Sequence, residues 1–171
     1  MNTLIPDQTT TVLENIVFLK NTTLFSAMPS GDLRAVASIA DDLTFPAGAQ
    51  IVRERDVGDS LYLIKQGTIR ISKKSTEGGS IDLATLSIGE CFGEMAVFDA
   101  ELRSATATAQ TDCRVLRIGG DDLVDVIMDC PSIALQMLKI FVKRLRAANT
   151  TIEKLSVAPG TRASANYGRE G

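Results

Sequence analysis

Two charged residues in the middle of the chain, Glu94 and Arg103, are of the right types to bind a small anionic ligand. Arg presents a planar fork of N–H donors that suits a phosphate, and its charge persists at any working pH. A carboxylate only accepts hydrogen bonds, so Glu94 could take a sugar hydroxyl but would repel a bare phosphate. Gly93 can bring the backbone close to a ligand, and a short helical turn that starts there would attract anions. These residues suit a ligand with one phosphate and one sugar hydroxyl.

The composition excludes most catalytic alternatives. The 171 residues contain no His, which rules out His-based triads, His metal sites and imidazole proton shuttles. Lys and Arg number 18, Asp and Glu number 21, and the formal charge of −3 is unlike the basic field of a general nucleic-acid binder. We therefore expect a protein that is not an enzyme and holds no metal.

The cysteines and the hydropathy indicate a cytoplasmic protein. Cys91, Cys113 and Cys130 match no zinc or iron–sulfur spacing, and we expect buried free thiols in a reducing compartment. No stretch approaches the roughly 20 apolar residues of a membrane span. Residues 1–11 lack the basic and apolar regions of a secretory signal. We expect no membrane contact.

The elements that must position Glu94 and Arg103 are predicted from the spacing of apolar residues. Residues 11–20 and 30–40 carry helical stripes, with Ser30 as the predicted N-cap of the second helix. In residues 43–118, glycines recur about every ten residues between short β-branched runs, which is typical of antiparallel strands joined by turns. About eight strands without intervening helices predict a sandwich or jelly roll.

The last part of the chain is predicted to be helical again. Asp121 and Asp122 favour a helix N-terminus, and Pro131 suits a first helical turn. Apolar residues then recur at alternating steps of four and three, which predicts a coiled-coil seam and a homodimer: Ala134, Leu138, Phe141, Leu145, Ala148, Ile152 and Leu155. We expect a helical segment at 1–22, a ligand-binding domain at 23–156 with its dimerisation helix at 131–156, and a flexible tail at 157–171.

The run Phe-Gly-Glu-Met-Ala at 92–96, with Arg-Ser-Ala-Thr at 103–106, resembles the phosphate-binding cassette of cyclic nucleotide-binding domains. The resemblance covers about residues 24–155 and includes the turn and strand pattern at 45–48, 58–64 and Gly67. It implies an α+β fold: an antiparallel β jelly-roll (double-stranded β-helix) barrel, flanked by N-terminal helices and a long C-terminal helix. It also implies a non-catalytic cyclic mononucleotide sensor that binds cAMP or cGMP and signals by repositioning that helix.

The resemblance assigns roles at the phosphate and the ribose. Arg103 would neutralise the exocyclic phosphate oxygen, and Glu94 would accept the ribose 2′-hydroxyl. Ser104 would bond the phosphate or the base edge. Main-chain N–H groups would meet the phosphate, from Gly93, Glu94, Ala96 and Ala105.

The resemblance also implies a pocket wall and a contact with the base. Phe92 and Met95 would shape the wall of the pocket. The base would meet the long helix, where Asn149 and Thr150 are candidates, from the same subunit or from a partner subunit. Arg144 on that helix could reach Glu94.

Two other interpretations stay open. In the first, the chain is a structural dimerisation module with a vestigial pocket, in which Glu94 and Arg103 form a structural ion pair. Its dimer would be insensitive to Arg103→Ala. In the second, the chain is a cupin-like barrel enzyme, although cupins normally use metal-binding His and the chain has none.

The expected partners are a cyclic nucleotide, a second copy of the chain and an effector protein that the sequence does not identify. Catabolite activator-type regulators carry a winged helix-turn-helix after the long helix. Such a module needs roughly 60 residues, and only a short tail follows Leu155. We therefore expect no DNA binding by this chain alone.

Overall fold

The computed structural model describes residues 8–75, 78–98 and 102–157. The chain divides into two compact units, residues 1–136 and residues 137–171. All the described strands lie in the first unit. The second unit consists, among the described residues, of the helix α5 from residue 137 onward.

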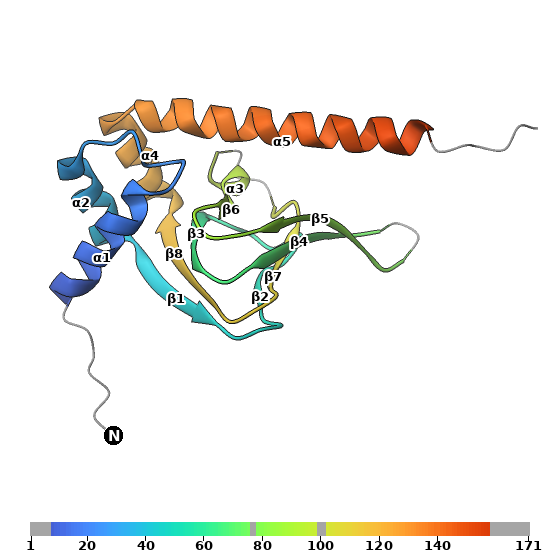
Figure 1. Ribbon diagram of the computed structural model, residues 1–171, viewed down its shortest axis with the longest axis horizontal. Helices are drawn as coiled ribbons and strands as arrows, with labels where there is room; N and C mark the ends of the chain where they lie inside the picture. The colour runs from blue at the N-terminus through green and yellow to red at the C-terminus, as the bar shows by residue number, and fades with distance from the viewer. Residues whose placement is uncertain (1–7, 76–77, 99–101, 158–171) are drawn as a thin grey trace, which may run out of the picture. The chain divides into compact units, whose positions relative to one another are not determined.

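Helices stand before, within and after the strands. The helices are α1 (Gln8–Lys20), α2 (Ser30–Ile39), α3 (Met95–Phe98), α4 (Gly120–Asp129) and α5 (Ser132–Val157). The strands are β1 (Asp41–Phe45), β2 (Gln50–Val52), β3 (Ser60–Gln66), β4 (Ile69–Lys74), β5 (Ser80–Leu86), β6 (Cys91–Phe92), β7 (Thr106–Ala109) and β8 (Cys113–Gly119). Figure 1 shows α1, α2 and α4 gathered at one end of the strands.

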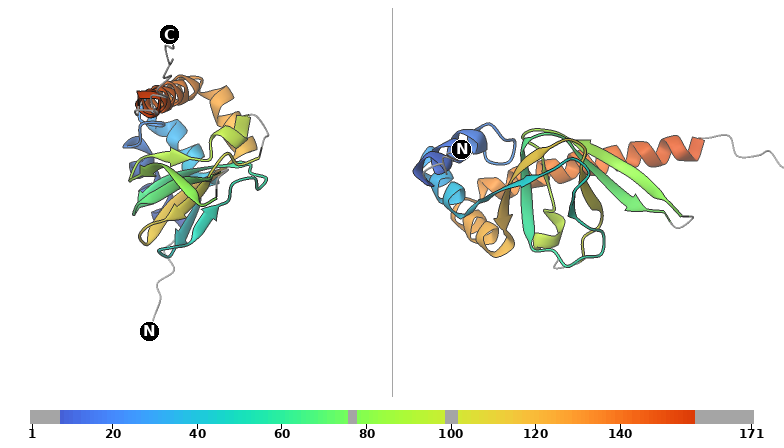
Figure 2. Two further views of the ribbon diagram at one scale, coloured as in Figure 1. Left: turned by 90° about the vertical axis from the view of Figure 1, so that its right-hand side faces the viewer. Right: turned by 90° about the horizontal axis from the view of Figure 1, so that it is seen from below.

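The strands form two four-stranded sheets in which every pair is antiparallel. The order is β1-β8-β3-β6 in one sheet and β2-β7-β4-β5 in the other. Both views in which the β4–β5 hairpin is clear show it extending away from the end that carries α1 and α2 (Figures 1 and 2). The predicted antiparallel β core with flanking helices is therefore confirmed. No strand pairing joins the two sheets within the described residues, so a closed sheet is not observed.

The core lies between the two sheets because each sheet contributes one apolar face. Its buried members come from both sheets: Ile64, Ile69, Leu86, Phe92, Ala107, Ala109, Cys113 and Val115. The helices bury a further apolar set, which includes Leu19, Phe25, Leu33, Val36 and Leu123. All three cysteines are free thiols, and Cys91 and Cys113 are buried as expected, whereas Cys130 is only half-buried.

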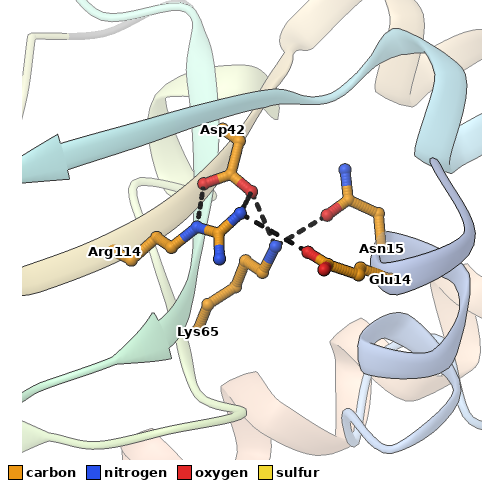
Figure 3. A network of polar contacts seen from close by, with 5 residues as sticks. All are labelled: Glu14, Asn15, Asp42, Lys65 and Arg114. Atoms are coloured by element: carbon orange, nitrogen blue, oxygen red, sulfur yellow. Dashed lines mark hydrogen bonds and ion pairs between the residues drawn. The ribbon is translucent and has the colours of Figure 1, made fainter. Parts of the chain in front are cut away.

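A part-buried polar network ties α1 to the first sheet (Figure 3). Lys65 Nζ donates to Asn15 Oδ1 at 2.8 Å and to Asp42 Oδ2 at 2.6 Å. Arg114 donates to the same carboxylate through Nε at 2.7 Å and Nη2 at 2.8 Å, and it lies 3.6 Å from Glu14 Oε2. The hydrogen bonds to Asp42 raise the pKa of Arg114 above its ordinary value. The network joins α1, β1, β3 and β8.

The structure corrects three local expectations. Ser30 is the first residue of α2 rather than its cap, because Pro29 occupies that position and its carbonyl accepts from the N–H groups of Asp32 and Leu33. The first strand begins at Asp41, before the predicted residue 43. The strand at 91–92 was not predicted, since two residues are too few to show a period.

The other predictions concern the start of α4, the domain limits and the C-terminal tail. Asp121 and Asp122 do lie in the first turn of α4. The domain limits at 1–22, 23–156 and 131–156 stay predictions. The expected flexible tail at 157–171 lies outside the described residues except for Val157, which ends α5.

Candidate functional site

Arg103 is a buried residue whose backbone is fixed by the turn at 53–56. Its N–H donates to Asp56 O at 2.9 Å, and its carbonyl accepts from Arg55 N at 2.8 Å. Arg103 as a whole residue is only 6% exposed. Nη1 donates to two main-chain carbonyls, Ser60 O at 3.0 Å and Gly93 O at 2.8 Å. The guanidinium is therefore held between the start of β3 and the segment after β6.

Two glycines make room for this guanidinium. A Cβ atom on Gly58 would overlap Nε, Cζ and Cδ of Arg103. A Cβ atom on Gly93 would lie 2.7 Å from Arg103 Nη1 and 2.7 Å from Ser60 O, and Gly93 also has a φ of +84°. A side chain at Gly58 would have to displace the guanidinium, and one at Gly93 would also meet the Ser60 carbonyl and strain a left-handed backbone.

Aromatic rings support the guanidinium from the core side. Tyr62 and Phe92 are paired residues of β3 and β6, and their rings stack with centroids 5.0 Å apart and planes 8° apart. Arg103 Cζ lies 5.8 Å from the centroid of the Tyr62 ring, within the range of a cation–π contact. Phe92 is thus a core residue, 4% exposed, behind the ring that faces Arg103.

Among the described residues, no carboxylate lies within hydrogen-bond or ion-pair distance of the guanidinium, and Asp59 acts on it only through longer-range electrostatic attraction. Within the part of the chain that the structure describes, Arg103 makes no ion pair, and its two side-chain hydrogen bonds both come from Nη1. Nε and Nη2 therefore keep donors that no described residue uses. A buried charge that no counter-ion contacts directly is costly. An anion bound at Nε and Nη2 would offset that cost.

A hollow of about 240 Å³ adjoins Arg103. It is lined by Ile51 and Val52 of β2, by residues of the 53–59 loop, and by Ser60, Tyr62, Arg103 and Arg117. A hydrogen bond from the Ser60 hydroxyl, followed by the positive charge of Arg117, holds the pKa of Asp59 below its ordinary value of 3.8. The Asp59 carboxylate beside the hollow is therefore ionised at neutral pH.

Glu94 is the second charged residue that the sequence singled out. It follows Gly93, whose carbonyl accepts from Arg103, and it is only 2% exposed. Its own carbonyl accepts from Val97 N at 3.2 Å, which begins the short helix α3. The fold thus brings a buried carboxylate and a buried guanidinium into the same neighbourhood.

The other predicted site residues are placed differently. Ser104 and Met95 are exposed, and Ser104 Oγ lies 3.7 Å from Met95 Sδ. Ala105 is half-buried directly before β7, and Ala96 belongs to α3. Asn149, Thr150 and Arg144 belong to α5 in the second unit, so their contacts with a base or with Glu94 stay predictions.

The structure adds site residues that carried no role in the sequence analysis. Gly58, Ser60 and Tyr62 contact or make room for Arg103, and Asp59 and Arg117 line the same hollow. The run at 58–64 was noted as a turn and strand pattern. Its role at the site depends on contacts across more than 40 residues of sequence, such as the pair Ser60 and Arg103.

None of the described helices combines the length and apolar character needed to cross a lipid bilayer. No group of three or more potential metal ligands was found in the described ranges.

Known proteins that are similar to this chain include cyclic nucleotide-binding regulators, in agreement with the geometry of the site. Residues 42–130 match the family model described as "Cyclic nucleotide-binding domain". The chain is 29% identical over 132 residues to the "CRP-like cAMP-activated global transcriptional regulator" of Mycobacterium tuberculosis, which covers 77% of this chain and 59% of that protein. It is 30% identical over 138 residues to the "Cyclic AMP receptor protein" of Thermus thermophilus, which covers 81% of this chain and 64% of that protein.

Solved structures show the same likeness. The crystal structure of Thermus thermophilus catabolite activator protein superposes with a TM-score of 0.72 at 30% identity, and the match covers 79% of this chain and 63% of that one. The chain thus spans less than two thirds of the length of these relatives.

Proposed function

We propose that this chain, which belongs to the cyclic nucleotide-binding domain family, binds a cyclic mononucleotide through Arg103 and acts as a non-catalytic regulatory domain. The relatives with which it is compared carry names of cAMP-activated or cAMP-receptor regulators. We take cAMP as the first ligand to test, and cGMP as the second.

One observation carries the proposal: a guanidinium that is almost fully buried and has no carboxylate within hydrogen-bond or ion-pair distance among the described residues. A cyclic phosphate brings a single negative charge, which is what such a group needs. Arg103 Nε and Nη2 would donate to the phosphate, while Nη1 stays on Ser60 O and Gly93 O. Each charge-assisted hydrogen bond of this kind contributes roughly 1.5–3 kcal/mol.

The neighbouring residues fit the rest of such a ligand. The Glu94 carboxylate, 2% exposed, would accept the ribose 2′-hydroxyl. Main-chain N–H groups of Gly93, Glu94, Ala96 and Ala105 would complete the phosphate site, with Ser104 at the phosphate or the base edge. Met95 would form an outer wall, since it is 51% exposed.

The signalling step that we infer follows from chain order. The cassette lies before β7 and β8, which lead through α4 and Cys130-Pro131 into α5. We infer that ligand binding repositions α5, that Asn149 meets the base, and that α5 forms a homodimer. We also infer that the two sheets form a jelly roll, which their strand orders support.

Isothermal titration calorimetry with cAMP, cGMP, 5′-AMP and a cyclic dinucleotide tests the proposal. We expect saturable binding of a cyclic mononucleotide. Ligand at 100 times its dissociation constant should stabilise the fold by about 2.7 kcal/mol, a rise of about 5–10 °C in Tm. Absence of heat and of any Tm change with millimolar cAMP and cGMP would refute it.

Variants of Arg103 show whether binding occurs at the proposed site. Arg103→Lys keeps the charge but loses the planar fork, so the affinity should fall about tenfold or more. Arg34→Lys is a matched control on the exposed side of α2 and should bind like the unmodified protein. Equal affinity of Arg103→Lys and Arg34→Lys would place the ligand elsewhere.

A further inference from the structure

Ser60 is the residue at which three polar contacts meet beside Arg103. It is the first residue of β3 and is 1% exposed. Its carbonyl accepts from Arg103 Nη1 at 3.0 Å, and its hydroxyl donates to Asp59 Oδ1 at 2.7 Å. The same hydroxyl accepts from Arg117 Nε at 3.0 Å. Ser60 therefore links the two arginines, one through its main chain and one through its side chain.

The sheet places Arg117 for this contact. In β8, Arg117 is the register partner of Tyr62 in β3 and of Asp41 in β1. Its Nη1 donates to Asp41 Oδ2 at 3.2 Å, and its Nη2 lies 3.9 Å from Asp59 Oδ1. The carboxylates of Asp41 and Asp59 thus hold the guanidinium of Arg117, and its Nε donates to the Ser60 hydroxyl.

Arg117 holds the segment at residues 57–60, which is otherwise attached to the fold mainly through its backbone. The side chain of Asp59 is 82% exposed, and the neighbouring Val57 is 88% exposed. Asp59 O accepts from Gly120 N at 2.6 Å, which attaches the same segment to the first turn of α4. The Ser60 hydroxyl is therefore the point at which a side chain controls the position of the carbonyl that orients Arg103.

We propose that Arg117 is a positioning residue for the anion site, acting through the Ser60 hydroxyl to keep the Ser60 carbonyl on Arg103 Nη1. The proposal rests on the proposed function, because it assigns Arg117 to the same ligand site. Without Arg117, Ser60 loses a charged donor, and the guanidinium of Arg103 must be ordered when the ligand binds. Ordering a side chain on binding costs affinity.

Arg114 provides a matched control on the same strand. Its side chain is 37% exposed and that of Arg117 is 38% exposed, and each pairs with an Asp of β1. Arg114 contacts Asp42 and Glu14 but not Ser60. A purely structural role of Arg117 in bracing β1 against β8 would make the two arginines behave alike.

Calorimetry with cAMP on the full chain compares Arg117→Ala, Ser60→Ala, their double variant and Arg114→Ala. We expect Arg117→Ala and Ser60→Ala each to weaken binding by about three- to tenfold. The double variant should be no weaker than the worse single variant, because both single changes remove the same hydrogen bond, that from Arg117 to the Ser60 hydroxyl. Arg114→Ala should lower Tm and leave the affinity unchanged. Ser60→Ala removes only one oxygen atom, so it can test the proposal by itself if Arg117→Ala fails to fold.

A second measurement needs no ligand. The rotation of the Arg103 guanidinium about its Cζ–Nη bonds can be followed by ¹⁵N NMR, with the signal assigned by its loss in Arg103→Lys. We expect faster rotation in Arg117→Ala and Ser60→Ala but not in Arg114→Ala.

The outcomes separate the two proposals. Unchanged Arg103 rotation in both Arg117→Ala and Ser60→Ala overturns the positioning role, whatever the affinities. If the unmodified protein binds cAMP and Arg103→Lys does not, equal affinity in Arg117→Ala also overturns it while the proposed function stands. If the unmodified protein binds no cyclic nucleotide, the proposed function fails and the rotation alone decides the role of Arg117.

Discussion

Gly58 and Arg103 occupy adjoining space, so that a single methyl group on Gly58 would overlap the Nε, Cζ and Cδ atoms of the arginine. The φ angle of Gly58 is not in the left-handed region. A residue such as Ala would therefore suit its backbone, and the requirement for glycine comes from the guanidinium. This relationship makes Gly58 a probe of the anion site that carries no functional group of its own.

We expect Gly58→Ala to displace the Arg103 side chain and to weaken cyclic nucleotide binding at least about tenfold, as loss of the fork would. Calorimetry measures the affinity, and circular dichroism checks the fold. Gly31→Ala is the control, because a Cβ at Gly31, in the first turn of α2, meets no atom within 4 Å. That control should keep full affinity and gain slight stability from helix propensity. Full affinity in Gly58→Ala would mean that Arg103 does not bind the ligand.

The network around Asp42 should dominate the stability of the α1 attachment. Asp42→Asn removes the charge that both Lys65 and Arg114 contact, and the Lys65 side chain is 8% exposed. We expect a loss of about 3–5 kcal/mol in the free energy of unfolding, measured by urea denaturation. Asp82→Asn removes the partner of Arg70 in a pair that is 62% and 39% exposed, and it should cost less than about 1 kcal/mol. Equal losses in the two variants would contradict this account.

The pairing of Arg114 with Asp42 should persist under alkaline conditions. The pKa of Arg114 in the folded protein lies above its ordinary value, so its contribution to stability is complete below that ordinary pKa. It is lost only as pH rises through the higher folded pKa.

Ligand affinity should be constant between about pH 5.5 and 7.5. The chain has no His, and the phosphate of a cyclic nucleotide does not titrate there. The pKa of Asp59 lies below 3.8, so its contribution to stability is present above that value and is lost only as pH falls through the folded pKa. Calorimetry at five pH values checks this. A change of more than about threefold across the window would reveal a titrating group that the site described here does not contain.

Self-association should depend on the apolar residues of α5. Leu138, Leu145 and Ile152 are 57%, 63% and 60% exposed in the single chain, and they follow the predicted coiled-coil seam. We expect a dimer in sedimentation equilibrium, and a monomer after Leu138→Glu combined with Leu145→Glu. Lys143→Gln, an exposed change on the same helix, should leave the dimer intact. A monomeric unmodified chain would exclude the seam as a dimer interface.

Local periodicity predicted those elements that are long enough to show a period. The alternation expected in Ile69-Arg70-Ile71-Ser72 is only partly observed in β4. Ile69 is buried, but Ser72 is buried too and Ile71 is half-buried, and a register shift falls between residues 71 and 72. The strand at Cys91–Phe92 is set by pairing with Tyr62 and Leu63, which no local pattern reveals. The start of α2 depended on Pro29, whose carbonyl replaces the expected Ser30 cap.

At the site, the residue types of the cassette identified Arg103 and Glu94, both of which are buried. The partners of Arg103 were not predictable in the same way. Ser60 acts on it through a carbonyl, which every residue has, and Gly58 acts through the absence of a side chain. Arg117 reaches the site from a different strand, through the Ser60 hydroxyl. Such contacts depend on tertiary structure alone.

The most direct test of the central claim follows the Arg103 Nε–H signal by ¹⁵N NMR during titration with cAMP. If the phosphate binds this guanidinium, the signal should shift and saturate at the ligand concentration at which the calorimetric heat saturates. Saturable heat with an unchanged Arg103 signal would contradict the claim that Arg103 holds the ligand.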